Sequence, residues 1–464
     1  MGRTLFKTNV AVSCLFFVCS SAFGEDAVKG SVAQGTATAN PIDLSLSDAI
    51  QRGLKFNLSL LNSTETSNSV RAQRLSVLSA LLPNVNGNYT ESYNRVNLVA
   101  EGFDFKLPPN TGFSIPLVVT YPSIQTEATL SQSVFSLQRF RNLRSADANL
   151  QAAQLSVQDS RDLVVEAVGN AYLLIIADTA RIDTAKAQAD TSQVLFQRAV
   201  DLHTAGTAPA IDQLRAEVQL RTDQQSLLVA QNQADKDKIA LGRVIGLPPG
   251  QQFNLSDRLP FAPLDAMTPE IALRQAFANR ADFKAAEERV RAAMLARRAA
   301  VAEYYPTVDL NANFGDAGSY LSNSHNVFGV AGAVNFPIFN GGRIRADVEQ
   351  TDVTIRNRQN ELGDLRGQID QQVRTALLDL RSAADQFAVA QRNVQLAHET
   401  LTQSRDRFTA GITDNVEVVQ AQQSVVTADS NLIDATYRHN QAKIELARAL
   451  GMTEQNVGHF LLQK

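Results

Sequence analysis

The chain repeats itself, and this internal duplication constrains its fold more than any other feature of the sequence. The segment HTAGTAPAIDQLRA (203–216) matches FTAGITDNVEVVQA (408–421), and residues 45–89 match residues 267–314. Self-similarity over such distances means that one structural unit is used twice. We therefore expect two structural repeats that carry the same elements in the same order.

Each repeat is predicted to contain helix, strand, strand, helix and helix. Alanine, glutamine, leucine, arginine and aspartate dominate the helical runs, which have no internal proline, and this composition favours helix. The first repeat (45–250) should hold helices 48–82, 138–204 and 210–246 and strands at about 84–98 and 123–135. The second (267–452) should hold helices 269–303, 343–409 and 412–450 and strands at about 307–316 and 326–337. A linker (251–266) joins the repeats, a polar segment (25–44) precedes them and a C-terminal tail (453–464) follows.

The two Thr-Ala-Gly segments are predicted to be the tips of helical hairpins. Glycine at the third position can adopt the positive φ that ends a helix, and the polar residues that follow can cap the next one. A helix of 67 residues would be about 100 Å long, and two shorter helices stacked end to end would match it. The chain should therefore form an elongated, hollow or coiled helical body rather than a globule.

The predicted strands have one apolar and one polar face. Val308, Leu310 and Ala312 alternate with Asp309 and Asn311, which is the pattern of a half-buried strand, and an ordinary solvated sheet would also show it. Strands of about 9–11 residues can cross a bilayer, but four are too few to close a barrel, and lipid does not tolerate an open sheet edge. If the strands span a membrane, several chains must combine, and three chains would supply twelve strands.

The first 24 residues are predicted to be a secretory signal peptide. Arg3 and Lys7 precede an apolar run at 10–18, and small residues follow near position 24. Both cysteines of the chain lie in this segment, at positions 14 and 19, so lipoprotein processing is the alternative. No later apolar run approaches the 18–20 residues of a spanning helix.

Composition gives little support for other classes of function. The net charge of −4 comes from 43 basic and 47 acidic residues that are interspersed, so no basic face for nucleic acid is expected. The sequence has no phosphate-binding glycine loop, no HExxH and no GxSxG motif, and its five histidines are scattered. We expect no enzyme, no cofactor and no metal site.

The sequence resembles the TolC-like outer-membrane efflux proteins, also called outer membrane factors. The resemblance is carried by LSDAIQRGLKFN and TPEIALRQAFANRADFKAAE at the heads of the repeats, by NFPIFNGGRIRA (335–346), by RFTAGITDNVEVVQAQ (407–422) and by ARALG (447–451). It covers residues 42–452.

The resemblance implies a homotrimer in the outer membrane of a Gram-negative bacterium. Surrounded by outer-membrane lipid, a twelve-stranded β-barrel would continue into a long α-helical tunnel in the periplasm. The implied function is that of a passive exit duct for drugs, toxic compounds or polypeptides, in a tripartite efflux or type I secretion system. Its implied partners are a periplasmic adaptor (membrane fusion) protein and an inner-membrane transporter.

The resemblance also implies particular residues at the tips. Glu417 would belong to an acidic ring at the tunnel constriction, with Gln420 as the next inward residue and Asp212 in the equivalent place of the first repeat. The two acids could instead simply complement the helix dipole. The implied adaptor contacts are Thr204, Ala205, Gly206, Thr409, Ala410 and Gly411, which could also be merely solvated loop residues.

A second class of function stays open at this point. A non-transporting periplasmic or surface helical scaffold, or an adhesin, could use the strands only to pair its subunits. The duplication and the strand alternation favour a pore, and the sequence does not identify the cargo.

Overall fold

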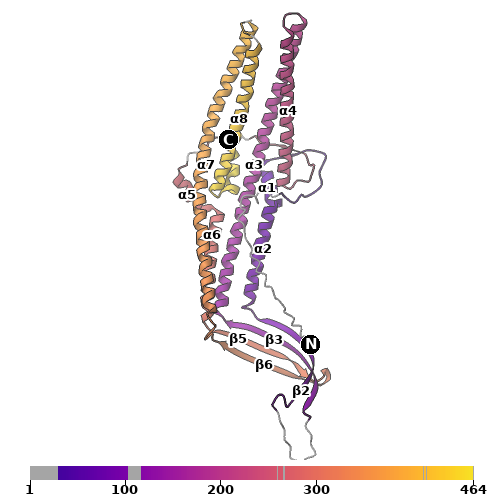
Figure 1. Cartoon of the computed structure of the whole chain (residues 1–464), viewed down its shortest axis with the longest axis vertical. Helices are drawn as coiled ribbons and strands as arrows, with labels where there is room; N and C mark the ends of the chain where they lie inside the picture. Colours follow the sequence, from indigo (N-terminus) through magenta and orange to yellow (C-terminus); the bar gives the residue numbers. More distant parts are fainter. Residues whose placement is uncertain are drawn as a thin grey trace, which may run out of the picture.

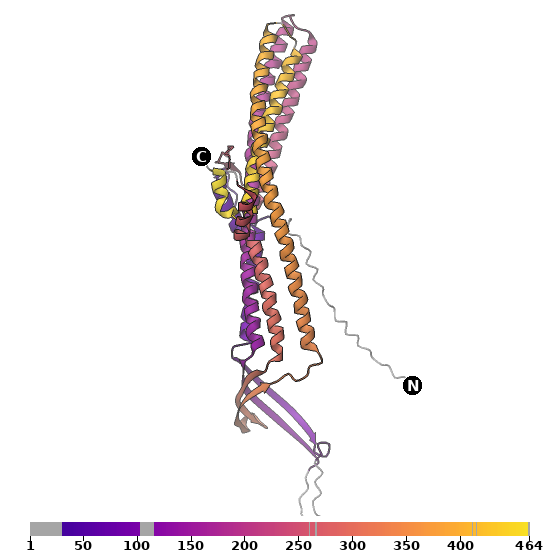
Figure 2. The ribbon, with the colours of Figure 1, turned by 90° about the vertical axis from the view of Figure 1, so that its left-hand side faces the viewer.

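The chain forms a long helical body with a four-stranded sheet at one end, as the computed structural model in Figure 1 shows. The structure describes residues 30–102, 116–258, 260–264, 267–410, 412–413 and 415–462. The predicted signal peptide lies outside the described residues. A lobe, which contains residues 42–44, 253–255 and 453–462, projects from one side of the helical body at mid-height, and Figure 2 shows it in profile.

The elements follow one another in the same order in both halves of the chain. The helices are α1 (Leu46–Phe56), α2 (Leu58–Ser79), α3 (Leu137–Thr204), α4 (Ala210–Val244), α5 (Pro269–Asn279), α6 (Ala281–Val301), α7 (Arg343–Thr409), α8 (Asn415–Ala449) and α9 (Thr453–Leu462). The strands are β1 (Ile42–Leu44), β2 (Asn84–Asn97), β3 (Val118–Phe135), β4 (Phe253–Leu255), β5 (Thr307–Gly318) and β6 (Ser324–Asn335).

The helices form four columns. Near the sheet, α2 packs on α3, α3 on α6, and α6 on α7; towards the tips, α4 packs on α3 and α8 packs on both α3 and α7. Each long helix, α3 or α7, therefore runs alongside two shorter stretches of helix placed end to end. This confirms the predicted elongated helical architecture.

Two predicted helices, 48–82 and 269–303, were wrong as single helices, because each is broken once. Asn57 separates α1 from α2 with an extended backbone (φ −66°, ψ 130°), and its side chain accepts a hydrogen bond from the Ser59 amide. Arg280 breaks the second repeat at the matching place (φ −57°, ψ 123°). Neither break carries proline or glycine, so the usual signals are absent.

The breaks exist because other segments supply their hydrogen bonds and space. The Val32 amide donates to the Phe56 carbonyl, and the Leu58 amide donates to the Gly30 carbonyl. In the second repeat Gly451 lies against the backbone of Arg280, where a Cβ would stand 2.7 Å from the Arg280 Cα. Tertiary contacts thus override local helix propensity.

Three segments in which no helix or strand was predicted contain regular structure. The polar segment 25–44 ends in β1 and the linker 251–266 contains β4, and these strands pair in parallel, Ile42 opposite Phe253. The tail 453–464 holds α9. These elements are short and build the lobe, so their stability depends on packing that no local pattern reveals.

The four-stranded sheet has the order β2-β3-β5-β6 and is antiparallel throughout. The two repeats meet at the β3–β5 pair, and β2 and β6 are the outer strands. β3 begins earlier than the predicted 123–135, at Val118. Pro122 does not end the strand. β5 pairs with β3 only from Ile124 onwards, so at Pro122 the strand β3 has a neighbour on one side only, and proline is tolerated at such an edge position.

Helix α3 carries the main apolar core at mid-height. Val164, Val165, Val168 and Tyr172 are completely buried against α1, β1 and β4, and the Tyr172 hydroxyl donates to the Leu44 carbonyl at 3.0 Å. Contrary to the sequence-based expectation, α3 contains a window that is long and apolar enough to cross a membrane. Half of this window is buried in the protein, so it is a core segment of the helical body.

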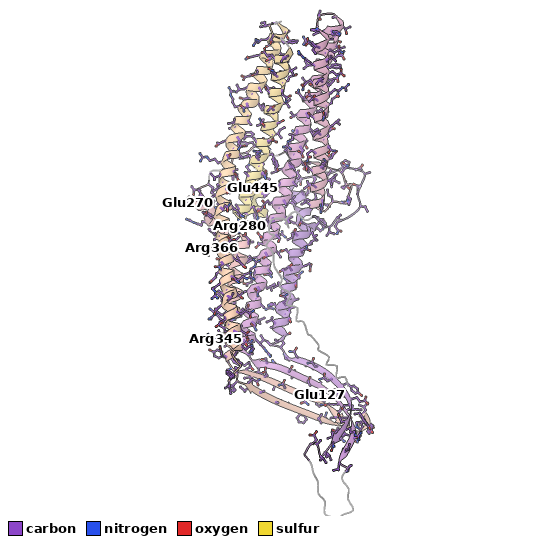
Figure 3. All side chains as sticks on the ribbon, in the orientation of Figure 1. Glu127, Glu270, Arg280, Arg345, Arg366 and Glu445 are labelled. Carbon is purple, nitrogen blue, oxygen red and sulfur yellow. The ribbon has the colours of Figure 1, made fainter. Side chains whose placement is uncertain are left out.

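A charged cluster joins the repeats at the same height, and Figure 3 labels Arg280 and Glu445 there. Arg448 of α8 lies 2.7 Å from an Asp159 carboxylate oxygen and 3.7 Å from Glu166, both on α3. Burial raises the pKa of Asp159 and of Glu166 above the ordinary carboxyl range, although Arg448 acts in the opposite direction. Burial also opposes ionisation of Asp282, but the Arg280 ion pair lowers its pKa below the usual value.

We predict that Arg448→Met destabilises the chain by about 3–5 kcal/mol, because the variant leaves two largely buried carboxylates without their cation. The urea midpoint, followed by circular dichroism at 222 nm in detergent, should fall. Arg345→Met is the matched control, since its pair with Glu349 is exposed on both sides, and it should leave the midpoint unchanged. An unaltered midpoint for Arg448→Met would contradict the structural role of the cluster.

The Arg448→Met defect should also depend on pH. Removing the guanidinium raises the native pKa of Asp159 and Glu166 further, so the native state binds protons at a pH where the unfolded chain has released them. The free energy of unfolding of the variant should therefore rise as the pH falls from 7.5 towards 5, and the difference in this free energy between variant and wild type should become smaller. Urea midpoints of both proteins at three pH values measure this difference. A difference that does not change with pH would refute the prediction.

Candidate functional site: the two-faced sheet and the helical tips

The strand register sorts the sheet into an apolar and a polar face. One cross-strand row consists of Val85, Leu130, Ala312 and Val330, and the next row consists of Asn86, Thr129, Asn313 and Gly329. Successive residues of a strand point to opposite faces. Glu127, labelled in Figure 3, belongs to the polar face, opposite Asn88 and Gly315.

The apolar face is left uncovered by the part of the chain that the structure describes. Phe328 is 78% exposed, Val330 70% and Tyr93 77%. Large contiguous apolar surfaces of this kind mark contacts with membranes or partners. The sheet can therefore meet lipid on one face and water on the other.

The polar face continues onto the helices. Asp309 of β5 points to this face, and its carboxylate lies 4.0 Å from the Arg139 guanidinium on the first turn of α3. On the next residue of α3, Phe140 is 46% exposed, and it lies on a different side of the helix. The polar face of the sheet thus continues onto the side of α3 that carries Arg139.

At its other end, the helical body terminates in two hairpins, α3–α4 and α7–α8, which stand as separate arms in Figure 1. Thr204 is the last residue of α3, Ala205 is its C-cap, and Gly206 has φ +70°. The Thr207 amide donates to the Leu202 carbonyl and the Gly206 amide to the His203 carbonyl, which is the Schellman arrangement. The Gly206 backbone therefore requires the conformational freedom predicted for it.

The second hairpin ends α7 in the same manner. Thr409 is the last helical residue, Ala410 is the C-cap, and the Ile412 amide donates to the Arg407 carbonyl at 3.0 Å. Gly411 lies outside the described residues. At the first tip the expectation of a polar cap on the following helix was wrong, because the N-cap of α4 is Pro209, which makes no side-chain cap bond.

Glu417 is held within its own hairpin. One carboxylate oxygen lies 3.3 Å from the Arg407 guanidinium and accepts from the Ser404 hydroxyl at 3.4 Å, and the other accepts a hydrogen bond from the Thr413 hydroxyl. The Glu417 side chain is 34% exposed. Sequence reasoning missed Arg407, although its position ten residues before Glu417 across a hairpin turn could have suggested the pair.

The other two predicted constriction residues have looser surroundings. Asp212 lies in the first turn of α4, 3.8 Å from the Arg215 guanidinium, and Gln420 is exposed on α8. Among the described residues, no hydrogen bond or ion pair links the α3–α4 tip to the α7–α8 tip. A single chain therefore does not bring Glu417 and Asp212 together.

No group of three or more metal-ligating side chains occurs in the part of the chain that the structure describes. Of the histidines, His439 is buried on α8, with Nε2 3.1 Å from the Ala262 carbonyl and its ring against Phe261. Burial lowers the pKa of this imidazole. It anchors the linker between the repeats to the helical body.

Comparison with known proteins agrees with this geometry. The model of the outer membrane efflux protein family matches residues 49–247 and 272–452, one segment in each repeat. The chain is 26% identical over 345 residues to the probable efflux pump outer membrane protein TtgC of Pseudomonas putida. This match covers 70% of this chain and 69% of that protein. It is 28% identical over 222 residues to the cation efflux system protein CusC of Escherichia coli, covering 46% and 47%.

The fold matches solved structures over nearly its whole length. The Campylobacter jejuni CmeC outer membrane channel superposes with a TM-score of 0.74 at 15% identity, covering 94% of this chain and 95% of that one. The fold, the two-faced sheet and the family match in both repeats lead to one conclusion. The chain belongs to the outer membrane efflux protein family.

Proposed function

We propose that this chain forms, as a homotrimer, the passive exit duct of a tripartite efflux pump. Members of the family are outer-membrane efflux channels whose helical part lies in the periplasm. The observation that carries the proposal is the four-stranded sheet with one exposed apolar face, one polar face and two outer strands. The relatives are channels, and the proposal requires no catalysis by this chain.

Three copies would complete the barrel. In lipid the unpaired N–H and C=O groups of β2 and β6 would cost several kcal/mol each, so β2 of one subunit must pair with β6 of the next. Twelve strands exceed the roughly eight that the smallest membrane barrels use, and they leave room for a water-filled interior. Asn86, Asn88, Asp309, Asn311 and Asn313 would line that interior.

The hairpin tips would contact a periplasmic adaptor, which in turn links the duct to an inner-membrane transporter. The support is an apolar surface around the tips, where Ile211 is 50% exposed, Leu214 57% and Ile412 69%. Together with Thr204, Ala205, Gly206, Thr409, Ala410 and Gly411, these residues would form the docking surface. Exposed loop tips commonly carry such contacts.

The constriction would depend on how Glu417 is paired. In the present arrangement Arg407 neutralises Glu417, so a ring of three Glu417 carboxylates would attract cations only weakly. Release of this pair would expose the acids to the duct. Asp212 and Gln420 would contribute less, since Asp212 faces Arg215 and Gln420 has no charge.

The names of the relatives favour efflux of small solutes. They include a toluene efflux pump protein, a cation efflux protein and a pyoverdine export protein. These cargoes share no chemistry, so we propose small-molecule or ion efflux without naming the substrate. The scaffold alternative would leave Phe328 and Val330 exposed to water, which a bilayer avoids.

We predict that single cysteines will separate the two faces of the sheet. Asn313→Cys, on the polar face, should react quickly with a charged methanethiosulfonate reagent in a planar bilayer and change the channel conductance. Phe314→Cys, its neighbour on the apolar face, should react slowly in the bilayer and readily in denaturant. The natural cysteines of the sequence are at positions 14 and 19, so the protein without an introduced cysteine is labelled in parallel to measure the background.

Equal reaction of the two cysteines in the bilayer would contradict the assignment of the faces. Absence of any conductance from the wild-type protein would contradict the duct itself. The two results are distinguishable, because labelling can be read by mass even when no current flows.

We predict opposite shifts of ion preference from the two partners at the tip. Arg407→Gln should free the Glu417 carboxylate and raise the cation preference of single channels, whereas Glu417→Gln should lower it. The reversal potential in a KCl gradient measures both. Arg392→Gln, an exposed change of the same charge elsewhere on α7, controls for net charge.

Identical reversal potentials in the wild type, Arg407→Gln and Glu417→Gln would show that Glu417 does not face the conducting path. A shift of Arg392→Gln equal to that of Arg407→Gln would show that only the total charge matters.

A further inference from the structure

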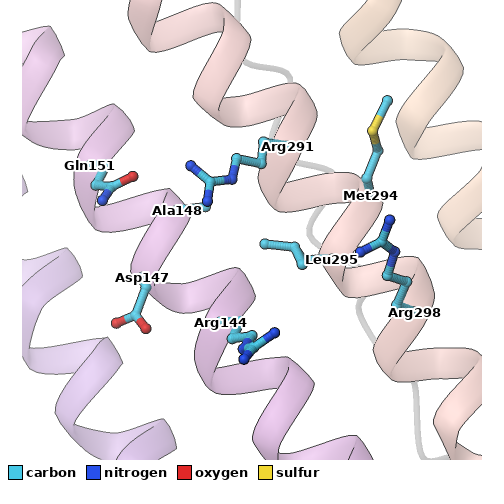
Figure 4. A pocket seen from close by; sticks show the side chains of 8 residues that line it. All are labelled: Arg144, Asp147, Ala148, Gln151, Arg291, Met294, Leu295 and Arg298. Atoms are coloured by element: carbon cyan, nitrogen blue, oxygen red, sulfur yellow. The ribbon is translucent and has the colours of Figure 1, made fainter.

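A basic groove lies between α3 and α6 close to the sheet, and the duct function does not use it. The cavity has a volume of about 530 Å³ and is shown in Figure 4. Arg144 of α3 and Arg291 and Arg298 of α6 surround it, with Met294 and Leu295 between them. The groove therefore combines cationic and apolar walls.

The positive charge of the groove is only partly compensated. Arg291 pairs with Glu288 at 3.2 Å, and Asp147, the acid that lines the cavity, is engaged by Arg74 at 2.6 Å. Within the described ranges, neither Arg144 nor Arg298 has a carboxylate within 4.0 Å. These two guanidinium groups are available to an anion.

The groove opens on the side of the helical layer that carries the lobe. Arg144 and Gln151 on its wall, and Val165 and Tyr172 beneath the lobe, recur at multiples of seven residues along α3, so with a drift of about 20° per heptad they lie within about 80° of one another around the helix. Figure 2 shows the lobe projecting from one side only. Three such lobes cannot fit inside an open duct, so this side faces outwards.

The sheet supports the same orientation. Arg139 reaches the water-facing residue Asp309, whereas Phe140 and Arg144 lie together on another side of α3, with the guanidinium 4.7 Å above the phenyl ring. The groove therefore continues the lipid-facing side of the sheet rather than the duct interior.

Neighbouring subunits would leave the groove free. Near the sheet the helices have the order α2-α3-α6-α7, which parallels the strand order β2-β3-β5-β6. Subunit contacts form at the outer columns, α2 and α7, while the groove lies between the two inner columns. It stays open in the trimer.

The depth of the groove matches the headgroup layer. Arg298 is three residues from the end of α6 and Arg144 is seven residues from the start of α3, which places them about 5 and 10 Å from the helix ends. The polar layer on each side of a bilayer is about 5–8 Å thick, and arginine side chains reach several ångströms along the helix.

We propose that this groove binds an anionic phospholipid of the periplasmic leaflet. The lipid phosphate lies between Arg144 and Arg298, and the glycerol and first acyl carbons lie against Phe140, Met294 and Leu295. Guanidinium groups suit phosphate oxygens through charge-assisted hydrogen bonds. The inference rests on the proposed trimeric duct and on the outer-membrane placement of its sheet, and it is independent of the cargo and of the tip contacts.

Native mass spectrometry of the purified full-length protein tests the proposal. The protein is titrated with phosphatidylglycerol, with phosphatidylcholine of the same acyl chains, and with inorganic phosphate. We expect saturable retention of one phosphatidylglycerol per chain and weaker retention of phosphatidylcholine. Arg144→Gln with Arg298→Gln should weaken phosphatidylglycerol binding roughly 10- to 30-fold, since each basic side chain near a lipid surface contributes about 1 kcal/mol.

The control variant replaces Arg221 and Arg392, two exposed arginines on helices towards the tips, by glutamine, and should bind like the wild type. Equal binding of phosphatidylglycerol by the groove variant and the control variant would overturn the proposal. Equal retention of phosphatidylcholine and phosphatidylglycerol by the wild type would do the same and requires no variant to fold. Competition by millimolar inorganic phosphate, with no gain from acyl chains, would show a free-anion site and not a lipid site.

Discussion

One constraint governs this structure: backbone polar groups cannot remain unpaired in lipid. The sheet satisfies its internal strands β3 and β5 on both sides but leaves β2 and β6 with one partner each. A chain of this design cannot span a membrane alone. The exposed apolar face is stable in this setting because lipid, and not water, covers it. The polar face must then enclose a water-filled space once several sheets join.

The helical body transmits the geometry of the sheet to the tips. Its four columns follow the order of the four strands near the sheet, so a closed ring of strands implies a closed ring of helices. The breaks at Asn57 and Arg280 interrupt the short columns, while α3 and α7 run through uninterrupted. The apolar core on α3 and the Arg448 cluster fix the repeats to each other at that height. The sheet and the hairpin tips are thereby held at opposite ends of one helical body.

The sequence predicted the repeated and periodic features well, because periodicity and turn glycines are local. The two faces of β5 and β6 and the positive φ of Gly206 follow directly from residue type and spacing. The helix breaks could not be predicted, since Asn57 and Arg280 gain their conformation from Gly30, Val32 and Gly451, which are distant in the sequence. The β1–β4 pair and α9 are too short to show a period. At the tip, the family resemblance suggested Glu417 as a constriction residue, which stays a prediction, whereas its Arg407 partner depends on how two helices meet.

The mass of the conducting species is the most direct test of the central claim that several open sheets close one barrel. Native mass spectrometry of the protein released from the lipid discs in which its conductance has been recorded should give three chains. A mass of three chains agrees with twelve strands, with β2 of each subunit paired to β6 of the next. A conducting species of one or two chains would contradict the account, because it would contain four or eight of these strands and not the twelve that three chains supply.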